Sequence, residues 1–185
     1  VAAQDAVFTA DTGMTNVWQA RYIRPLGTRR IIGSFKHGTM ANALPHAIGA
    51  QFAYPDRQVI SMSGDGGLSM LLGELVTAAT YRLPLTVVLF NNSTLGMVKL
   101  EMLVDGLQDY GVDVPQTDYA AIARAEPPTL VLPDPFVVVG EWFHDGCNDY
   151  SGADEESAVQ DVELTLGEFA PGLGARAGAQ LCAVR

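Results

Sequence analysis

The sequence has few cysteines, no long apolar run and no basic N-terminal leader, and each absence excludes a class of protein. Cys147 and Cys182 are far apart and form no CxxC pair, so we expect reduced thiols and neither a disulfide framework nor a zinc site. No stretch approaches the roughly eighteen consecutive apolar residues of a membrane span. The first residues also lack the basic start and apolar middle of a signal peptide. We therefore expect a soluble, cytoplasmic chain.

Positive charge is also scarce, and it is unevenly placed. The formal net charge is -10; residues 1–125 hold 9 basic and 10 acidic side chains, whereas residues 126–185 hold 2 and 11. Such a balance disfavours nucleic acids and anionic lipid surfaces as partners, because both would be repelled. An anionic ligand must then be held by local groups.

The chain divides into two regions of different character. Residues 1–125 alternate β-branched runs with helical periods, which predicts an α/β domain: a parallel sheet flanked by helices. From Glu126 the run EPPTLVLPDP places four prolines within nine residues, and the rest is acidic and rich in Gly and Ala. We therefore predict one domain over 1–125 and a divergent acidic tail over 126–185.

The element boundaries follow from periodicity, caps and breakers. Predicted strands are Ala6–Ala10, Arg30–Ser34, Gln58–Ser63 and Leu85–Phe90, with Phe136–Val139 as the only later candidate. Predicted helices are a segment from a Thr15 or Asn16 cap to Tyr22, then Met40–Phe52, Leu68–Tyr81 (ended by Pro84), Leu95–Leu103 and Asp118–Ala125, the last capped by Thr117 or Asp118.

A glycine-rich turn with one acidic residue follows the third predicted strand. Gly64, Asp65, Gly66 and Gly67 join this strand to a helix. Glycines allow the sharp turn and expose amide N–H groups at a helix start, where an anion is favoured. Because Asp65 would repel a bare phosphate, its presence predicts a divalent cation between carboxylate and phosphate. The turn thus predicts a metal-bridged diphosphate.

The next strand, LPLTVVLFNN, ends in amides. Asn92 lies 27 positions after Asp65, and one right-handed crossover would bring the carboxyl ends of the two parallel strands side by side. Magnesium takes about six hard oxygen ligands, so Asp65 and Asn92 are expected to face one ion. Gly96 permits a second close backbone approach.

At this point the residues carry a resemblance. The string GDGGLSMLLGELVTAATYRLPLTVVLFNNSTLGMV resembles the GDG and NN motif of thiamine-diphosphate-dependent enzymes, which include pyruvate oxidases, acetolactate synthases and related decarboxylases. DTGMTNVWQARY and SFKHGTMANALPHAIGAQFAYPDRQVISMSGDGG further resemble the pyruvate:quinone oxidoreductases, also called pyruvate oxidases. The resemblance covers roughly residues 5–125 and implies the thiamine-diphosphate-binding fold.

The resemblance implies roles for individual residues. Magnesium would be held by the Asp65 and Asn92 side chains and the Thr94 carbonyl. Met40 would be the wedge that bends the cofactor, and the Gly38 carbonyl would accept a hydrogen bond from the exocyclic amine of the cofactor. The bent shape makes deprotonation of the reactive carbon an intramolecular step. The implied cofactor-binding set comprises Gly38, Thr39, Met40, Gly64, Asp65, Gly66, Gly67, Asn92, Thr94, Leu95, Gly96, Met97 and Val98.

The resemblance also implies partners. The family decarboxylates a 2-oxo acid such as pyruvate and passes electrons to flavin and quinone, so FAD is implied, although its domain lies outside this chain. An activating glutamate would come from a pyrimidine-binding domain, usually of a neighbouring subunit in a homo-oligomer; Glu74 and Glu101 are not expected to replace it. Peripheral membrane contact occurs in the family, but this tail does not support it. The chain alone is expected to bind or half-bind cofactor without turnover.

Several polar residues receive weaker interpretations. His37 in a glycine turn is equally compatible with the pocket wall and a plain loop, and His46 is interpreted as a surface or hydrogen-bonded helix residue. Lys99 and Glu101 are expected on a solvated helix face, although Glu101, with Met97, keeps a functional alternative near flavin or quinone. A final cluster, interpreted as an exposed polar loop and not a metal site, is Glu141, His144, Asp145 and Cys147.

Within the resemblance, an acetolactate synthase or a 2-oxo acid decarboxylase remains the alternative to a pyruvate oxidase. Two nucleotide-binding sites are disfavoured by missing residues. A nicotinamide dinucleotide module would need a third glycine and an acidic residue after the next strand, and neither is present. A nucleoside-triphosphate site would need GxxxxGK[ST], which is absent. The last alternative is an inactive fragment or assembly domain.

Overall fold

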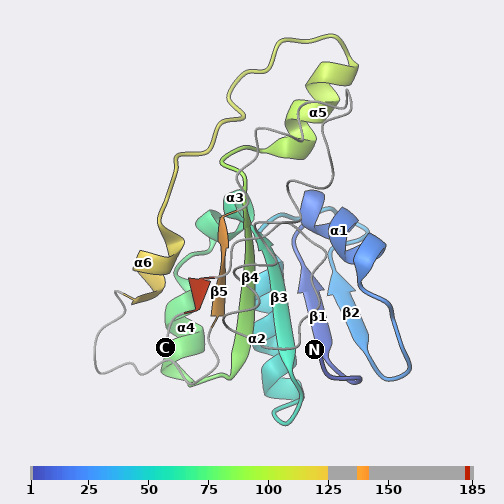
Figure 1. The fold of residues 1–185 in the computed structure, drawn as a ribbon, viewed down its shortest axis with the longest axis vertical. Coiled ribbons are helices and arrows are strands. Elements are labelled where there is room, and N and C mark those ends of the chain that lie inside the picture. The colour runs from blue at the N-terminus through green and yellow to red at the C-terminus, as the bar shows by residue number, and fades with distance from the viewer. Residues whose placement is uncertain (1, 125–136, 142–181, 184–185) are drawn as a thin grey trace.

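Six strands form a single sheet in the computed structural model, which describes residues 2–124, 137–141 and 182–183 (Figure 1). The strand order is β2-β1-β3-β4-β5-β6, parallel throughout except for β6, which runs antiparallel to β5. The strands are β1 (Val7–Ala10), β2 (Arg30–Gly33), β3 (Val59–Gly64), β4 (Leu85–Asn91), β5 (Val137–Glu141) and β6 (Cys182–Ala183).

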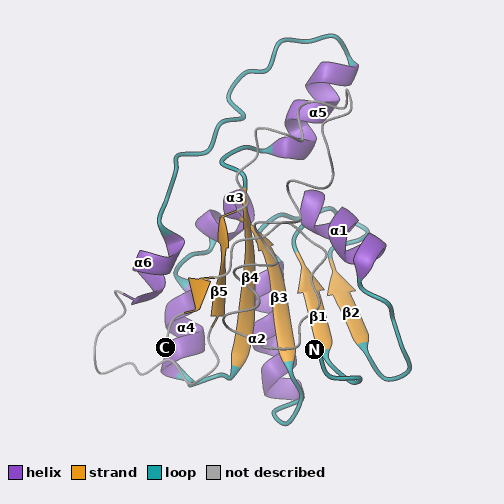
Figure 2. Cartoon of the chain, viewed as in Figure 1, coloured by secondary structure: helices purple, strands orange, loops and turns teal. Residues whose placement is uncertain are grey.

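Helices connect the strands and flank the sheet, as Figure 2 shows. They are α1 (Met14–Tyr22), α2 (Ala43–Ala53), α3 (Asp65–Met70), α4 (Glu74–Thr80), α5 (Gly96–Val104) and α6 (Tyr119–Arg124). The expected α/β class with a mostly parallel sheet is confirmed. Within the described residues, no helix is long and apolar enough to cross a membrane.

Alternation along the strands produces two cores, one on each face of the sheet. Val7, Val59 and Val87 pack with Leu44 and Ile48 of α2 in the larger core. The intervening residues point the other way and form the smaller core, whose members are Ala6, Phe8, Ala10 and Met62, with Ile23 and Phe90 packed against them. This period of two fixes which residues reach each layer of helices.

The sheet contains a topological switch point between β1 and β3. From β1 the chain crosses to β2 on one side, then returns past β1 to form β3 and β4 on the other. In parallel sheets the carboxyl ends beside such a switch form a crevice that ligands occupy. Because Gly64 pairs with Phe90, Asp65 leaves the sheet beside Asn91. The register therefore places Asp65 one residue away from the expected partner Asn92.

The predicted helix Leu68–Tyr81 is wrong in its continuity. The structure has two helices, α3 and α4, separated by a turn at Leu71–Gly73. Leu71 leaves helical geometry with φ -127° and ψ 39°, and Gly73 caps the start of α4. Apolar residues on both sides of the break keep a helical period, so the pattern alone does not reveal the turn.

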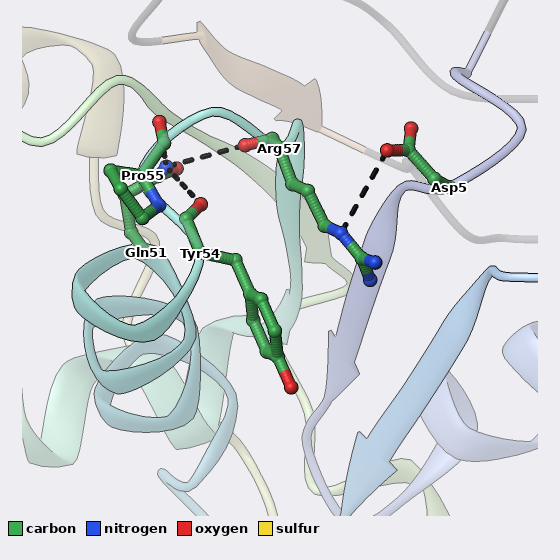
Figure 3. A network of polar contacts seen from close by, with 5 residues as sticks. All are labelled: Asp5, Gln51, Tyr54, Pro55 and Arg57. Atoms are coloured by element: carbon green, nitrogen blue, oxygen red, sulfur yellow. Dashed lines mark hydrogen bonds and ion pairs between the residues drawn. The ribbon is translucent and has the colours of Figure 1, made fainter.

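The predicted helix Met40–Phe52 begins later than expected. It starts at Ala43, which leaves Met40 in a turn before the helix, and Phe52 is 54% exposed instead of lying on the buried face. Gln51 is buried in its place. Its amide nitrogen donates to the carbonyls of Tyr54, Pro55 and Arg57, each at 3.2 Å. Figure 3 shows this network and the neighbouring ion pair of Arg57 with Asp5.

Two further expectations change at the ends of the described chain. Helix α1 begins at Met14 after Gly13, and Thr15 donates its hydroxyl to the Asp11 carbonyl at 2.6 Å instead of capping the helix. The strand expected at Phe136–Val139 is β5, although Phe136 lies outside the described residues. Glu141 ends β5 and is therefore not a loop residue; His144, Asp145 and Cys147 lie outside the described residues.

Candidate functional site

A cavity opens at the carboxyl ends of β1, β3 and β4, beside the switch point. Its walls come from the segment after β1, the turn before α2, the β3–α3 turn and the loop between β4 and α5. The lining residues are Asp11, Thr12, Gly13, Met14, Thr15, Trp18, Met40, Gly64, Asp65, Gly66, Gly67, Phe90, Asn92, Thr94, Leu95, Gly96, Met97 and Val98. The cavity therefore brings together four segments that are far apart in sequence.

Most of the residues predicted for cofactor binding line this cavity. The exceptions are Gly38 and Thr39, which are exposed and do not belong to its lining. His37 is also exposed and outside it, so its position matches that of a plain loop residue. Met97 lines the cavity, whereas Glu101 lies on the exposed part of α5. Lys99 forms an ion pair with Asp109 at 3.0 Å.

The glycine-rich turn is buried and closely packed. Gly64 is extended (φ -82°, ψ 155°), and α3 begins at the next residue. A Cβ atom on Gly67 would overlap the carboxylate of Asp11, and one on Gly66 would lie 2.7 Å from Leu95 Cδ2. The absence of side chains at these two positions lets the turn approach its neighbours, which agrees with the close approach predicted for the glycines.

Asp65 is the most unusual group in the cavity. Its side chain is 4% exposed, and Oδ2 is buried without a hydrogen-bond partner. Burial raises the pKa of this carboxyl, while backbone N–H groups of Gly66, Ser93 and Asn92 act in the opposite direction. A buried carboxylate oxygen without a partner costs free energy unless a cation or proton satisfies it.

The loop after β4 lines the same cavity through Asn92, Thr94 and Leu95. The Asn92 side-chain oxygen accepts from the Thr94 N–H at 3.2 Å, and Ser93 adopts a left-handed φ of 52°. A later segment of the chain holds this loop in place, because the Leu95 N–H and the Thr94 hydroxyl both donate to the Val112 carbonyl, at 2.7 and 3.2 Å. Asp65 and Asn92 both line this cavity.

A tyrosine holds the backbone of the glycine-rich turn from behind. The Tyr119 hydroxyl, from α6, donates to the Asp65 carbonyl at 3.1 Å, and its ring is 4% exposed. Burial, and secondly the charge of Asp65, raises the pKa of Tyr119, so the hydroxyl stays protonated and donates at neutral pH. Helix α6 therefore supports the position of Asp65 although it lies outside the cavity wall.

Sequence reasoning missed several residues of the wall. Asp11 follows β1 directly and is 2% exposed, Thr12 has a buried hydroxyl oxygen without a partner, and Trp18 and Phe90 supply aromatic surface. The signal that could have identified Asp11 is the one used for Asp65, namely an acidic residue directly after an apolar parallel strand. No glycine lies directly beside Asp11, so the sequence alone predicts no role for it.

Among the described residues, the cavity has no metal site built only from acidic, histidine or cysteine side chains. Across the described part of the chain, no three His, Cys, Asp or Glu side chains converge on one point. A cation in this cavity would need amide, backbone, ligand or water oxygens in addition to a carboxylate, and hard cations such as Mg²⁺ accept that mixture.

Comparison with known proteins places this cavity in a family. Residues 11–127 match the family described as thiamine pyrophosphate enzyme, C-terminal TPP binding domain. The chain is 44% identical over 124 residues to a thiamine pyrophosphate-containing protein, YdaP, of Bacillus subtilis (67% of this chain, 22% of that protein). It is 36% identical over 124 residues to pyruvate oxidase of Lactiplantibacillus plantarum (66% and 21%).

Two further similarities widen the range of reactions. The chain is 44% identical over 97 residues to the acetolactate synthase large subunit of Porphyra purpurea (52% of this chain, 16% of that protein). Among solved structures, a thiamine diphosphate-dependent 4-hydroxybenzoylformate decarboxylase of Rhodococcus jostii RHA1 superposes with a TM-score of 0.60 and 29% identity, over 66% of this chain and 23% of that one.

The matched segment spans only about a fifth of the length of these relatives. It covers the four wall segments of the cavity from Asp11 onward, and the solved relative shares the fold. The chain belongs to the thiamine pyrophosphate enzymes and carries their C-terminal TPP-binding domain.

Proposed function

We propose that the cavity binds the diphosphate of thiamine pyrophosphate through Mg²⁺ held by the Asp65 and Asn92 side chains and the Thr94 carbonyl. The observation that carries this proposal is Asp65 Oδ2, which is buried, without a partner and on the cavity wall. Carboxylate, amide and carbonyl oxygens are hard ligands that suit Mg²⁺. A bound cation would also remove the cost of burying the Asp65 charge.

The glycines around the cation would serve the diphosphate. Gly66 and Gly67 are buried at the start of α3, and a Cβ at Gly96 would lie 3.2 Å from the Asn92 amide nitrogen. Backbone N–H groups at such positions can donate to phosphate oxygens without obstruction from a side chain. We therefore assign Gly64, Gly66, Gly67 and Gly96 to the diphosphate end of the site.

The cofactor rings would lie against the apolar part of the wall. Met40 and Leu95 lie close to each other there, since both approach the position of a Cβ on Gly66, at 3.4 and 2.7 Å. Met97 and Val98 extend this wall along α5. We assign Met40 as the residue that supports the bent cofactor; Gly38 and Thr39, which lie outside the cavity lining, would contact it only from the exposed preceding turn. When bound, the thiazolium ring supplies the electron sink for decarboxylation.

For the whole protein we propose decarboxylation of a 2-oxo acid, with pyruvate as substrate and flavin and quinone as electron acceptors. The similarity to a pyruvate oxidase supports this assignment. The similarity to an acetolactate synthase and a decarboxylase supports the two alternative reactions. An activating glutamate from a pyrimidine-binding domain of another subunit, and hence a homo-oligomer, belongs to the same proposal.

Calorimetric titration tests the cofactor assignment. Thiamine pyrophosphate should bind the chain with Mg²⁺ present and lose at least about tenfold in affinity with EDTA, because the cation bridges two anionic groups. NADH should not bind. Asp65→Ala should abolish the magnesium dependence, whereas Asp56→Asn, at an exposed aspartate, should leave it unchanged. Equal affinity with and without Mg²⁺ would refute the proposal.

The reaction is tested on the full-length protein. With pyruvate, Mg²⁺ and thiamine pyrophosphate, reduction of a quinone analogue is expected for the oxidase reaction, acetolactate formation for a synthase, and acetaldehyde release without an electron acceptor for a simple decarboxylase. Binding without any of these products from 2-oxo acids would favour an inactive or assembly domain.

A further inference from the structure

The carboxylate of Asp11 contacts two neighbouring turns beside the cavity. One is the segment Met40–Asn42 before α2, and the other is the glycine-rich turn after β3. Asp11 follows the last residue of β1, the strand at the switch point, and its side chain is 2% exposed. The group is therefore fixed to the centre of the sheet and shielded from solvent.

Asp11 contacts both turns. Its Oδ1 accepts from the Ala43 N–H at 2.9 Å, at the start of α2. Burial raises the pKa of Asp11, while the backbone N–H groups of Ala43, Asn42 and Gly64 favour its ionised form. On the other side, Oδ2 occupies the space that a Cβ on Gly67 would need. One carboxylate thus contacts the two turns at once.

The turn before α2 needs such support, because its backbone is strained. Ala41 has a left-handed φ of 61°, which is unfavourable for a residue with a Cβ. The Asn42 side chain also ties this turn, donating to the Thr39 carbonyl and contacting His46 Nδ1 at 3.0 Å. Thr39 N–H in turn donates to Ser34 Oγ at 3.1 Å. Met40, directly before Ala41, is held in place by these contacts.

We infer that Asp11 is a positioning residue that sets the distance between the Met40 turn and the diphosphate-binding turn. The inference rests on the proposed function and adds to it. A bent cofactor must contact both turns simultaneously, with its diphosphate at one and its rings at the other. One buried carboxylate that accepts from the Ala43 N–H and packs against Gly67 fixes that spacing before the cofactor binds, which lowers the ordering cost of binding.

Asp11→Asn tests the inference with two ligands. The amide keeps the shape and one acceptor, but its NH₂ group faces backbone N–H donors, so one turn must move. Magnesium with inorganic pyrophosphate contacts only the glycine-rich turn and the Asn92 loop, whereas thiamine pyrophosphate also needs the Met40 turn. We expect the affinity for thiamine pyrophosphate to fall at least about fivefold more than that for magnesium pyrophosphate, with Asp56→Asn as the unaffected control. Equal losses for the two ligands, or none, would overturn the inference.

A double-mutant cycle separates positioning from general damage. If Asp11 acts through the Met40 turn, Asp11→Asn should weaken binding less in a Met40→Ala background than in the wild type. Additive effects would overturn the inference. Asp11→Ser, which keeps a short acceptor without an NH₂ group, serves as the second variant if the first does not fold. Loss of cooperative melting in both variants would assign Asp11 a purely structural role.

The wild-type chain distinguishes this inference from the proposed function. If the wild type fails to bind thiamine pyrophosphate with magnesium, the proposed function is refuted and the inference falls with it. If the wild type binds but Asp11→Asn binds both ligands equally well, only the inference is refuted.

Discussion

Replacing Asp65 with asparagine should stabilise the ligand-free chain while removing its response to cofactor. The carboxylate is buried, and Oδ2 has no partner in the described structure. An unsatisfied buried group costs about 1–3 kcal/mol and more when it is charged; the amide removes the buried charge and keeps one oxygen for the backbone N–H groups. A gain of about 1 kcal/mol would raise the melting temperature by roughly 2–4 °C for a chain of this size.

The ligand response should change in the opposite direction. At a concentration about 100 times Kd, a ligand stabilises the native state by about 2.7 kcal/mol, or roughly 5–10 °C here. Thermal melting with magnesium and thiamine pyrophosphate should show this shift in the wild type and in Asp56→Asn. Asp65→Asn should show almost none, since a neutral amide is a weaker ligand for Mg²⁺. A variant that melts lower without ligand and keeps the full shift would refute the reasoning.

Three further outcomes follow from the same region. Because burial raises the pKa values of Asp11 and Asp65, protonation of these groups favours the folded state. The free energy of unfolding of the ligand-free chain should therefore rise as the pH falls from 7 through the raised values toward 3.8. Urea unfolding at several pH values checks this, and a rise no larger in the wild type than in Asp65→Asn would contradict it. Gly67→Ala should destabilise the folded chain by about 1–3 kcal/mol because its Cβ overlaps Asp11. Gly49→Ala should stabilise it by about 1 kcal/mol, because the new Cβ meets nothing within 4 Å in α2. Calorimetric melting that ranks the two variants in the opposite order would contradict the packing described. Ala41→Gly should relieve the left-handed φ and raise stability by about 0.5–1 kcal/mol in chemical denaturation, so a fall in midpoint would show that the turn is unstrained.

Much of the sheet was predictable because its strands carry strong local signals. Gln58–Ser63 and Leu85–Phe90 are apolar runs that end in turn residues. In the structure β3 both begins and ends one residue later than predicted, and β4 ends one residue later. The pairing of Asp65 with the Asn92 loop followed from a rule about parallel strands, which does not depend on side-chain detail. The placement of these two residues beside one cavity agrees with that reasoning.

The remaining features depend on tertiary contacts that periodicity does not encode. Phe52 fits the apolar period of α2 but is exposed, whereas Gln51 is buried because its amide satisfies three carbonyls of the following loop. Met40 fits the same period but lies in the turn before Ala43, whose N–H donates to Asp11 after a distant strand. The contribution of Asp11 is visible only once β1 is placed beside β3.

The loop that Gln51 closes has a practical use. It precedes the amino end of β3, whereas the cavity lies at the carboxyl ends of the strands, and its residue Asp56 is exposed. A cysteine introduced there could carry a fluorophore or a surface tether that leaves the cofactor entrance free. A domain labelled at this position would carry its reporter group far from the bound ligand, with the rigid sheet between them.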